Sequence, residues 1–113
     1  MRMRKACIDD LSQINKIEKA AHTLSYYNER SLKHIINTSI TDSVIVFEIN
    51  NRIIGFLIEQ RCLNEISILN VAVDITYQDK GVGKKLIKQY LSKIPDNSIV
   101  FLEVNRNNFK ARK

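Results

Sequence analysis

The sequence predicts a single domain of the α/β class, more narrowly α+β, in which helices flank a mixed sheet in the order β-α-α-β-β-β-α-β. Apolar residues recur at helical spacing in three segments, and runs rich in β-branched residues lie before, between and after these segments. No internal repeat or linker divides the 113 residues. A chain of this length builds one core, so residues 1–113 are expected to form one domain.

A short strand and two helices are expected in the first third of the chain. The strand covers residues 3–8, and the carboxylates of Asp9 and Asp10 are placed to cap a helix that ends near His22. Asn28 offers the same kind of cap to a second, shorter helix. The apolar stripes are Leu11, Ile14, Ile17 and Ala21 in the first helix, and Leu32, Ile35 and Ile36 in the second.

Two β-branched runs, residues 44–49 and 53–58, follow the second helix. They are joined by Asn50 and Asn51, and asparagine tolerates the positive φ that a tight two-residue turn requires. These residues therefore predict an antiparallel hairpin.

The next strand, residues 65–73, changes the phase of its alternation. The residues expected on one face are Ile66 and Ile68, and those expected on the other are Leu69, Val71 and Val73. A bulge near Leu69 or Asn70 produces such a slip, because it inserts one extra residue into the strand. A strand buried on both faces explains the pattern equally well.

A third helix and a further strand are expected after this run. Apolar residues recur at helical spacing over residues 82–94, and Pro95 ends the helix. Residues 98–104 are again typical of a strand. The polar, basic residues 105–113 begin like the entry to another helix.

The charge and the cysteines restrict the class of protein. The net charge of +6 and the pI near 9.5 suit an anionic partner, although solubility alone explains the charge equally well. Cys7 and Cys62 have no nearby His or Cys at ligand spacing, so we expect reduced thiols in the core, no metal and no disulfide. An apolar leader and an apolar run of about 18 residues are both missing, which favours a cytoplasmic protein without membrane contact.

An anion-binding turn is predicted between the third long strand and the third helix, over Gln78-Asp79-Lys80-Gly81-Val82-Gly83-Lys84. Two glycines let the backbone approach a ligand closely, and a helix start leaves N–H groups unpaired and directed outward. The spacing fits neither a Walker A loop nor the dinucleotide fingerprint G-x-G-x-x-G. By itself, the pattern is also compatible with a helix start that binds no ligand.

The string ILNVAVDITYQDKGVGKKLI, residues 68–87, resembles the acetyl-CoA motif of the Gcn5-related N-acetyltransferases (GNAT). The strings IEKAAH (17–22) and LEV (102–104) resemble the RimI type within that superfamily, the ribosomal-protein-alanine N-acetyltransferases. The resemblance spans residues 3–111 and implies a mostly antiparallel sheet flanked by helices. It also implies acetyl-CoA as the co-substrate and no metal.

The resemblance implies roles for eleven residues. Backbone groups of Val71, Ala72 and Val73 would contact the pantetheine arm and the thioester carbonyl, beside a bulge. Glu103 takes the position of the general base, and Asn108 that of the Asn that bonds the pantetheine. Backbone amides would wrap the pyrophosphate over Asp79, Lys80, Gly81, Val82, Gly83 and Lys84. A solvent-facing strand carboxylate is the alternative interpretation of Glu103.

The sequence departs from the family pattern at two places. The Pro-Trp that usually follows the helix-one His is replaced by Ser25-Tyr26-Tyr27, which changes the loop beside the peptide site. The family's Tyr general acid lies beyond Asn108, and the chain ends at Lys113 before this position, the last helix and the last two strands. We therefore expect an uncovered sheet edge, with marginal stability or pairing of two copies.

The function implied is transfer of acetyl from acetyl-CoA to a protein N-terminal α-amine, of the ribosomal-protein alanine type, by direct attack. The alternative is a truncated remnant that binds acyl-CoA and transfers acetyl weakly or not at all. An RNA-binding domain is less favoured, because no RNP-like aromatic strand or recognition helix occurs and direct nucleic-acid contact is not expected. His22 is expected to interact with the last-turn carbonyls of its helix rather than to take part in catalysis.

Overall fold

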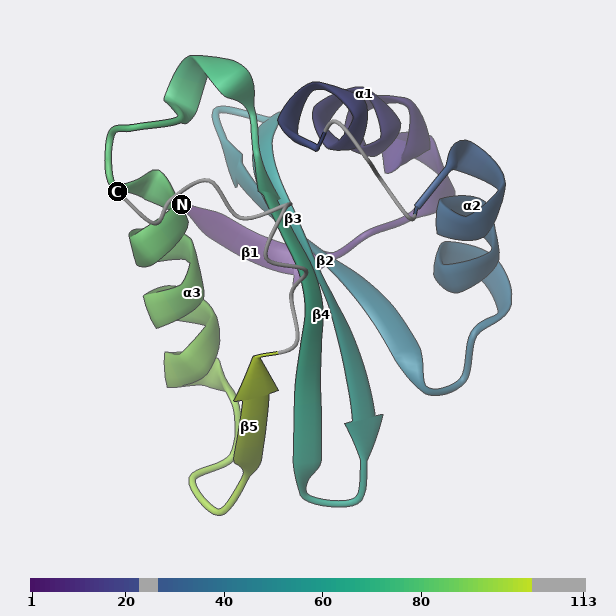
Figure 1. The fold of residues 1–113 in the computed structure, drawn as a ribbon, viewed down its shortest axis with the longest axis vertical. Coiled ribbons are helices and arrows are strands. Elements are labelled where there is room, and N and C mark those ends of the chain that lie inside the picture. The colour runs from purple at the N-terminus through teal and green to yellow at the C-terminus, as the bar shows by residue number, and fades with distance from the viewer. Residues whose placement is uncertain (23–26, 103–113) are drawn as a thin grey trace.

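A five-stranded sheet carries α1 and α2 on one face and α3 on the other in the computed structural model of this chain (Figure 1). The structure describes residues 1–22 and 27–102, so Tyr26, Glu103 and Asn108 lie outside the described residues. The strands are β1 (Arg2–Lys5), β2 (Asp42–Ile49), β3 (Arg52–Cys62), β4 (Glu65–Val73) and β5 (Ile99–Leu102). The helices are α1 (Leu11–Ala21), α2 (Glu29–Thr38) and α3 (Val82–Lys93), with short 3-10 turns η1 (Ile8–Asp10) and η2 (Ile75–Tyr77).

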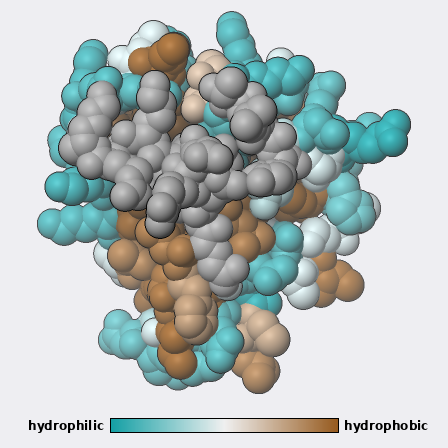
Figure 2. Space-filling model, viewed as in Figure 1, coloured by the Kyte–Doolittle hydropathy of each residue, from teal (hydrophilic) through white to brown (hydrophobic). Residues whose placement is uncertain are grey.

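The strands lie in the order β1-β2-β3-β4-β5, and neighbours run antiparallel except for the parallel pair β4 and β5. The predicted α/β class and the predicted order of elements are confirmed. The first strand is shorter than expected, because residues 8–10 form η1 instead of extending it. The expectation of core thiols is wrong, since Cys7 and Cys62 are both exposed. Among the described strands, β1 and β5 lie at the two edges of the sheet, and Ile99, Phe101 and Leu102 of β5 are exposed. Figure 2 shows an apolar area on this side of the molecule.

The two helix starts differ in how well the sequence predicts them. Asn28 caps α2 as expected, since its Oδ1 accepts the N–H of Ser31 at 2.8 Å. The prediction for Asp10 is wrong in its geometry. Its carboxylate does not cap α1 but reaches back to accept the N–H of Cys7 at 2.8 Å.

The hairpin between β2 and β3 forms as predicted. Asn50 and Asn51 have φ values of 52° and 65°, and Ile49 pairs with Arg52 across the turn. Both turn residues lie in the left-handed region, as a two-residue hairpin with the right twist requires.

The predicted bulge in β4 lies at Leu69. Asn70 pairs with Ile58 of β3, whereas the next β3 residue, Glu59, pairs with Ile68, so Leu69 is the extra residue. The strand is also buried on both faces, so the two interpretations of its pattern are both correct.

The predicted division of β4 between its faces is wrong. Val71 and Val73 join Ile66 and Ile68 in the core beneath α3, whereas Leu69 and Ala72 face the core beneath α1 and α2. The reason is the bulge itself. One inserted residue shifts the alternation, so that the positions after it share the face of Ile66 and Ile68. The α3 core is completed by Leu86 and Tyr90 of that helix, and the opposite core by Ile14, Ile17, Leu32 and Ile35.

A polar cluster ties β1 and β2 to the start of α1. Arg4 donates to both carboxylate oxygens of Asp10, at 2.8 and 3.0 Å, and its Nε donates to Glu48 at 3.1 Å. Both acceptor carboxylates are buried, with 8% of each side chain exposed. Arg4 therefore holds two buried charges, and the loss of either partner leaves a charge uncompensated.

Replacing Asp10 by Asn is expected to reduce the loss of unfolding free energy that occurs as the pH falls into the acid range. The Arg4 guanidinium lowers the pKa of Asp10 below its ordinary value of 3.8; burial opposes this shift and the Cys7 N–H supports it. The stability from such a group is complete above its unfolded pKa and is lost as the pH falls through the lowered folded value. The variant should be about 1–3 kcal/mol less stable near neutral pH.

Urea unfolding at a series of pH values from neutral down to strongly acidic measures this slope. Asp9→Asn is the matched control, because Asp9 is the exposed neighbour of Asp10. A slope in Asp10→Asn equal to that of the parent chain would contradict the assignment.

Candidate functional site

The predicted anion-binding turn lies between η2 and the first turn of α3. Gly81 occupies the N-cap with φ 76° and ψ 8°, and Asp79 also has a positive φ, of 63°. The first hydrogen bond of the helix runs from the N–H of Lys85 to the carbonyl of Gly81, at 3.2 Å. The N–H groups of residues 82–84 therefore precede the helical hydrogen bonds and point out of the helix end.

The two glycines of the turn have different surroundings. A Cβ on Gly81 would meet no atom within 4 Å, so the space beside it is open. A Cβ on Gly83 would lie 3.7 Å from Cγ2 of Val73, an ordinary contact. The helix start thus lies directly against the end of β4, which brings its free amides beside that strand.

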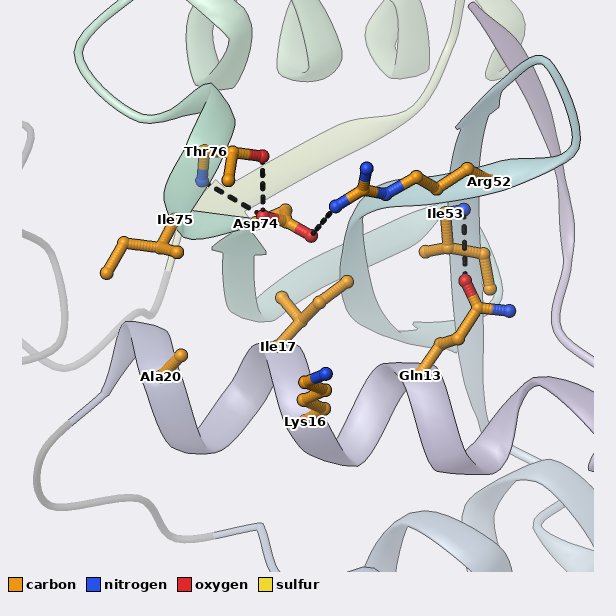
Figure 3. A pocket seen from close by; sticks show the side chains of 9 residues that line it. All are labelled: Gln13, Lys16, Ile17, Ala20, Arg52, Ile53, Asp74, Ile75 and Thr76. Atoms are coloured by element: carbon orange, nitrogen blue, oxygen red, sulfur yellow. Dashed lines mark hydrogen bonds and ion pairs between the residues drawn. The ribbon is translucent and has the colours of Figure 1, made fainter.

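Asp74 fixes the path from β4 into the turn. Its Oδ1 accepts the N–H and the hydroxyl of Thr76, each at 2.9 Å, and its Oδ2 lies 3.4 Å from Nη2 of Arg52 (Figure 3). Burial alone would raise the pKa of Asp74, but the bonds from Thr76 and the charge of Arg52 outweigh it and lower the pKa. The carboxylate is therefore ionised at neutral pH and holds η2 in place.

A pocket of about 300 Å³ lies beside this carboxylate, between α1, the start of β3 and the 74–76 segment (Figure 3). Its lining combines the apolar Ile17 and Ala20 of α1 with Lys16 and Arg52 at its rim. None of the predicted site residues lines it. The pocket is therefore separate from the turn, and it shares with the turn only the anchor at Asp74.

The alternation of the β3–β4 ladder determines which backbone groups of β4 point outward. Asp74 donates its N–H to the carbonyl of Ile54 at 2.8 Å, which makes this a hydrogen-bonded pair. Hydrogen-bonded and non-hydrogen-bonded pairs alternate along an antiparallel ladder. Ala72 is therefore directed at β3, whereas Val73 and Val71 direct their N–H and C=O groups away from β3, toward the β5 side.

The outward carbonyls of β4 are occupied by side chains. Nε2 of Gln78 donates to the carbonyl of Val73 at 3.0 Å, and Nε2 of His22 lies 2.9 Å from the carbonyl of Val71. The described part of β5 ends at Leu102, opposite Ile68, and so does not reach these positions. This edge consequently presents the N–H groups of Val71 and Val73, which are hydrogen-bond donors.

A buried polar cluster from α1 lies against the bulge. Glu18 Oε1 accepts the Asn70 amide at 2.8 Å, and Nε2 of His22 lies 3.7 Å from the same oxygen. The exposed fractions of Glu18, His22 and Asn70 are 0%, 4% and 1%. The expectation for His22 is wrong for its ring: only its backbone N–H bonds the last turn, at the carbonyl of Glu18, and the ring bonds β4.

The structure thus brings the predicted strand residues and the predicted turn together, and it adds Glu18, His22, Asn70 and Gln78, whose partners the sequence did not indicate. The IEKAAH string was the available signal for the first two. The roles predicted for Glu103 and Asn108 concern residues outside the described part of the chain. Residues 1–22 and 27–102 contain no cluster of metal-ligating side chains and no helix long and apolar enough to cross a bilayer.

Comparison with known proteins identifies the family. The model of the acetyltransferase (GNAT) family matches residues 8–113. The chain belongs to this family. A Haemophilus ducreyi protein named [ribosomal protein bS18]-alanine N-acetyltransferase is 30% identical over 111 residues, a match that covers 92% of this chain and 71% of that protein.

Two solved structures of N-acetyltransferases illustrate the similarity of fold. The ribosomal-protein-S18-alanine N-acetyltransferase of Escherichia coli aligns with a TM-score of 0.69 at 25% identity, over 80% of this chain and 57% of that chain. The PaiA N-acetyltransferase of Thermoplasma acidophilum, solved with coenzyme A, aligns with a TM-score of 0.62 at 18% identity, over 80% of this chain and 69% of that one. The structural match therefore covers little more than half of the solved E. coli chain.

Two alanine variants test the geometry of the turn. Gly81→Ala is expected to lower the free energy of unfolding by about 1–2 kcal/mol, because a left-handed conformation is unfavourable for residues with a Cβ. Gly83→Ala is the matched control and should be neutral or stabilising by up to about 1 kcal/mol, since alanine favours a helix and its Cβ has room. Urea unfolding without ligand measures both, and equal stabilities would contradict a left-handed Gly81.

Proposed function

We propose that this chain binds acetyl-CoA and transfers its acetyl group to the N-terminal α-amine of a protein. The observation that carries the proposal is the position of the α3 amides beside the outward edge of β4. One group suits the pyrophosphate of a coenzyme and the other suits its pantetheine arm. The two lie next to each other, as one extended ligand requires.

The pyrophosphate would bind at the start of α3, on the backbone amides of the turn. Each charge-assisted bond from an N–H contributes about 1.5–3 kcal/mol, against roughly 0.3–1 kcal/mol from the helix dipole. The amides therefore supply most of the affinity. Lys80 and Lys84 add positive charge, and Asp79 contributes through its backbone, so its negative charge does not prevent binding.

The pantetheine arm and the acetyl thioester would lie along β4. Its outward N–H groups, at Val71 and Val73, are two residues apart, or about 6.8 Å along a strand. They can bond carbonyl oxygens of the ligand, as an added strand would do. In this proposal the Val71 N–H, beside the bulge, faces the thioester carbonyl, where negative charge develops during the transfer. Asn108 would bond the arm from the segment outside the described residues.

The reaction would be direct attack by a neutral amine, with coenzyme A leaving as a thiolate or thiol. An N-terminal amine has a pKa near 7.7–8.0, so roughly 10–20% of it is neutral at pH 7, whereas a lysine amine with a pKa near 10.4 is almost wholly protonated. An N-terminal substrate therefore needs little help from a base. Glu103 is the residue we propose for removing the amine proton.

The acceptor we propose is a ribosomal protein that begins with alanine. The support is the name of the H. ducreyi and E. coli relatives, which refers to the alanine of ribosomal protein S18. The basic net charge of the chain, +6, is compatible with approach to a ribosomal particle. Such an acceptor places the reaction in the cytoplasm.

Calorimetry with acetyl-CoA and a transfer assay test the proposal. We expect heat of binding, and acetylation of a peptide that begins with alanine but not of the same peptide with a blocked N-terminus. Glu103→Gln should lower kcat about 5- to 10-fold at neutral pH, because roughly 10–20% of the amine is neutral there without a base, and less above the pKa of the amine, while coenzyme binding is retained. The exposed Glu65, replaced by Gln, is the matched control.

Each outcome of these measurements has a distinct meaning. Binding without transfer to any N-terminal amine would support the alternative, a remnant that holds acyl-CoA. The absence of both heat and a thermal shift at millimolar acetyl-CoA would refute the enzyme and the remnant together.

A further inference from the structure

His22 connects the end of α1 to the bulged strand through a single buried ring. It is the C-cap of α1, and its Nε2 lies 2.9 Å from the carbonyl of Val71, 49 residues later in the sequence. A carbonyl oxygen can only accept a hydrogen bond, so Nε2 carries the proton and donates. The other ring nitrogen, Nδ1, is buried and has no hydrogen-bond partner among the residues that the structure describes.

The same helix fixes the residue before Val71. Glu18 precedes His22 by one turn of α1, so both side chains project from the same side of the helix. Glu18 accepts the side-chain amide of Asn70, the residue that follows the extra residue of the bulge. The helix therefore bonds β4 at two consecutive residues, once through a side chain and once through a carbonyl.

These two bonds hold the side chain of the residue before Val71 and the peptide group after it. The Val71 N–H belongs to the peptide group between Asn70 and Val71, and the Val71 carbonyl belongs to the next one. The Glu18 bond holds the residue on one side, and the His22 bond holds the peptide group on the other. A bulge is a place where the ladder is locally disrupted, so its peptide orientation depends on such additional bonds.

We propose that His22 is a positioning residue, which holds the Val71 carbonyl so that the N–H of Val71 is aimed at the acyl carbonyl of the coenzyme. The inference rests on the proposed function for its chemistry, and on the His22–Val71 contact for its geometry. His22 does not touch the reacting atoms in this scheme. The His22 ring also occupies the outward carbonyl oxygen of Val71, so Val71 offers only its N–H donor at this edge. A donor suits the acyl carbonyl oxygen of the coenzyme, which gains negative charge during the transfer.

Three variants of His22 separate this role from simple packing. His22→Gln retains an N–H donor the same number of bonds from Cβ and should keep kcat within about 3-fold of the parent chain. His22→Asn, one bond shorter, and His22→Leu, without a donor, should lower kcat roughly 10- to 100-fold, because a misplaced transition-state donor has effects of this size. The KM for acetyl-CoA should change little, since the pyrophosphate amides are untouched.

His34→Leu is the matched control, because His34 is the other histidine of the chain and is exposed on α2. It should leave kcat unchanged. A loss of kcat that is equal in all three His22 variants, Gln included, would overturn the inference and indicate a packing role. A His22→Leu or His22→Asn variant with the kcat of the parent chain would overturn it as well.

A second measurement does not depend on activity. The carbonyl ¹³C resonance of Val71, measured without ligand, should shift in His22→Asn and His22→Leu and remain in place in His22→Gln and His34→Leu, because it reports the hydrogen bond to that oxygen. If the parent chain transfers no acetyl, the proposed function fails. The resonance alone then shows whether His22 bonds the Val71 carbonyl. An unchanged resonance in His22→Asn would overturn the inference even in an active enzyme.

Discussion

The extra residue in β4 is the constraint on which the rest of this structure depends. One inserted residue, Leu69, returns Val71 and Val73 to the face that packs beneath α3, so that both halves of the strand contribute to one core. Beyond the bulge, the outward carbonyls of Val71 and Val73 bond the side chains of His22 and Gln78 instead of a described neighbouring strand. The bulge therefore sets the packing of α3, whose first turn holds the amides proposed to bind the pyrophosphate, and the direction of the donors beside it.

Buried carboxylates lie beside this bulge on both faces of the sheet. On the α1 side Glu18 accepts the amide of Asn70. On the α3 side Glu59, at the register shift of β3, accepts the hydroxyl of Tyr90 and the Nε of Arg61. Burial and then the bond to Glu59 raise the pKa of Tyr90, so its hydroxyl stays protonated and donates. Buried charges are unfavourable unless they are well bonded, which explains why each carboxylate has donors of matching geometry.

Local features of the fold could be predicted from the sequence, and contacts between distant segments could not. The Asn50–Asn51 turn and the position of the bulge follow from neighbouring residues. The faces of β4 after the bulge were misassigned, because a period of two was continued without the shift that the extra residue causes. The anchors of the site join residues 49 and 52 positions apart, His22 to Val71 and Glu18 to Asn70, and no local pattern encodes such pairs.

In the proposed site, the turn and the bulge have different roles because they are separate parts of the structure. Affinity for a coenzyme would come from amides at a helix start, which tolerate changes of neighbouring side chains because the bonds are made by the backbone. Reactivity would depend on the orientation of one peptide group, which α1 controls through buried side chains. A substitution in the α1 cluster can therefore alter turnover without altering coenzyme affinity, whereas a change at Gly81 acts first on the turn. The IEKAAH string joins the helix to the strand, and this link explains why an apolar helix face contains a buried carboxylate and a buried imidazole.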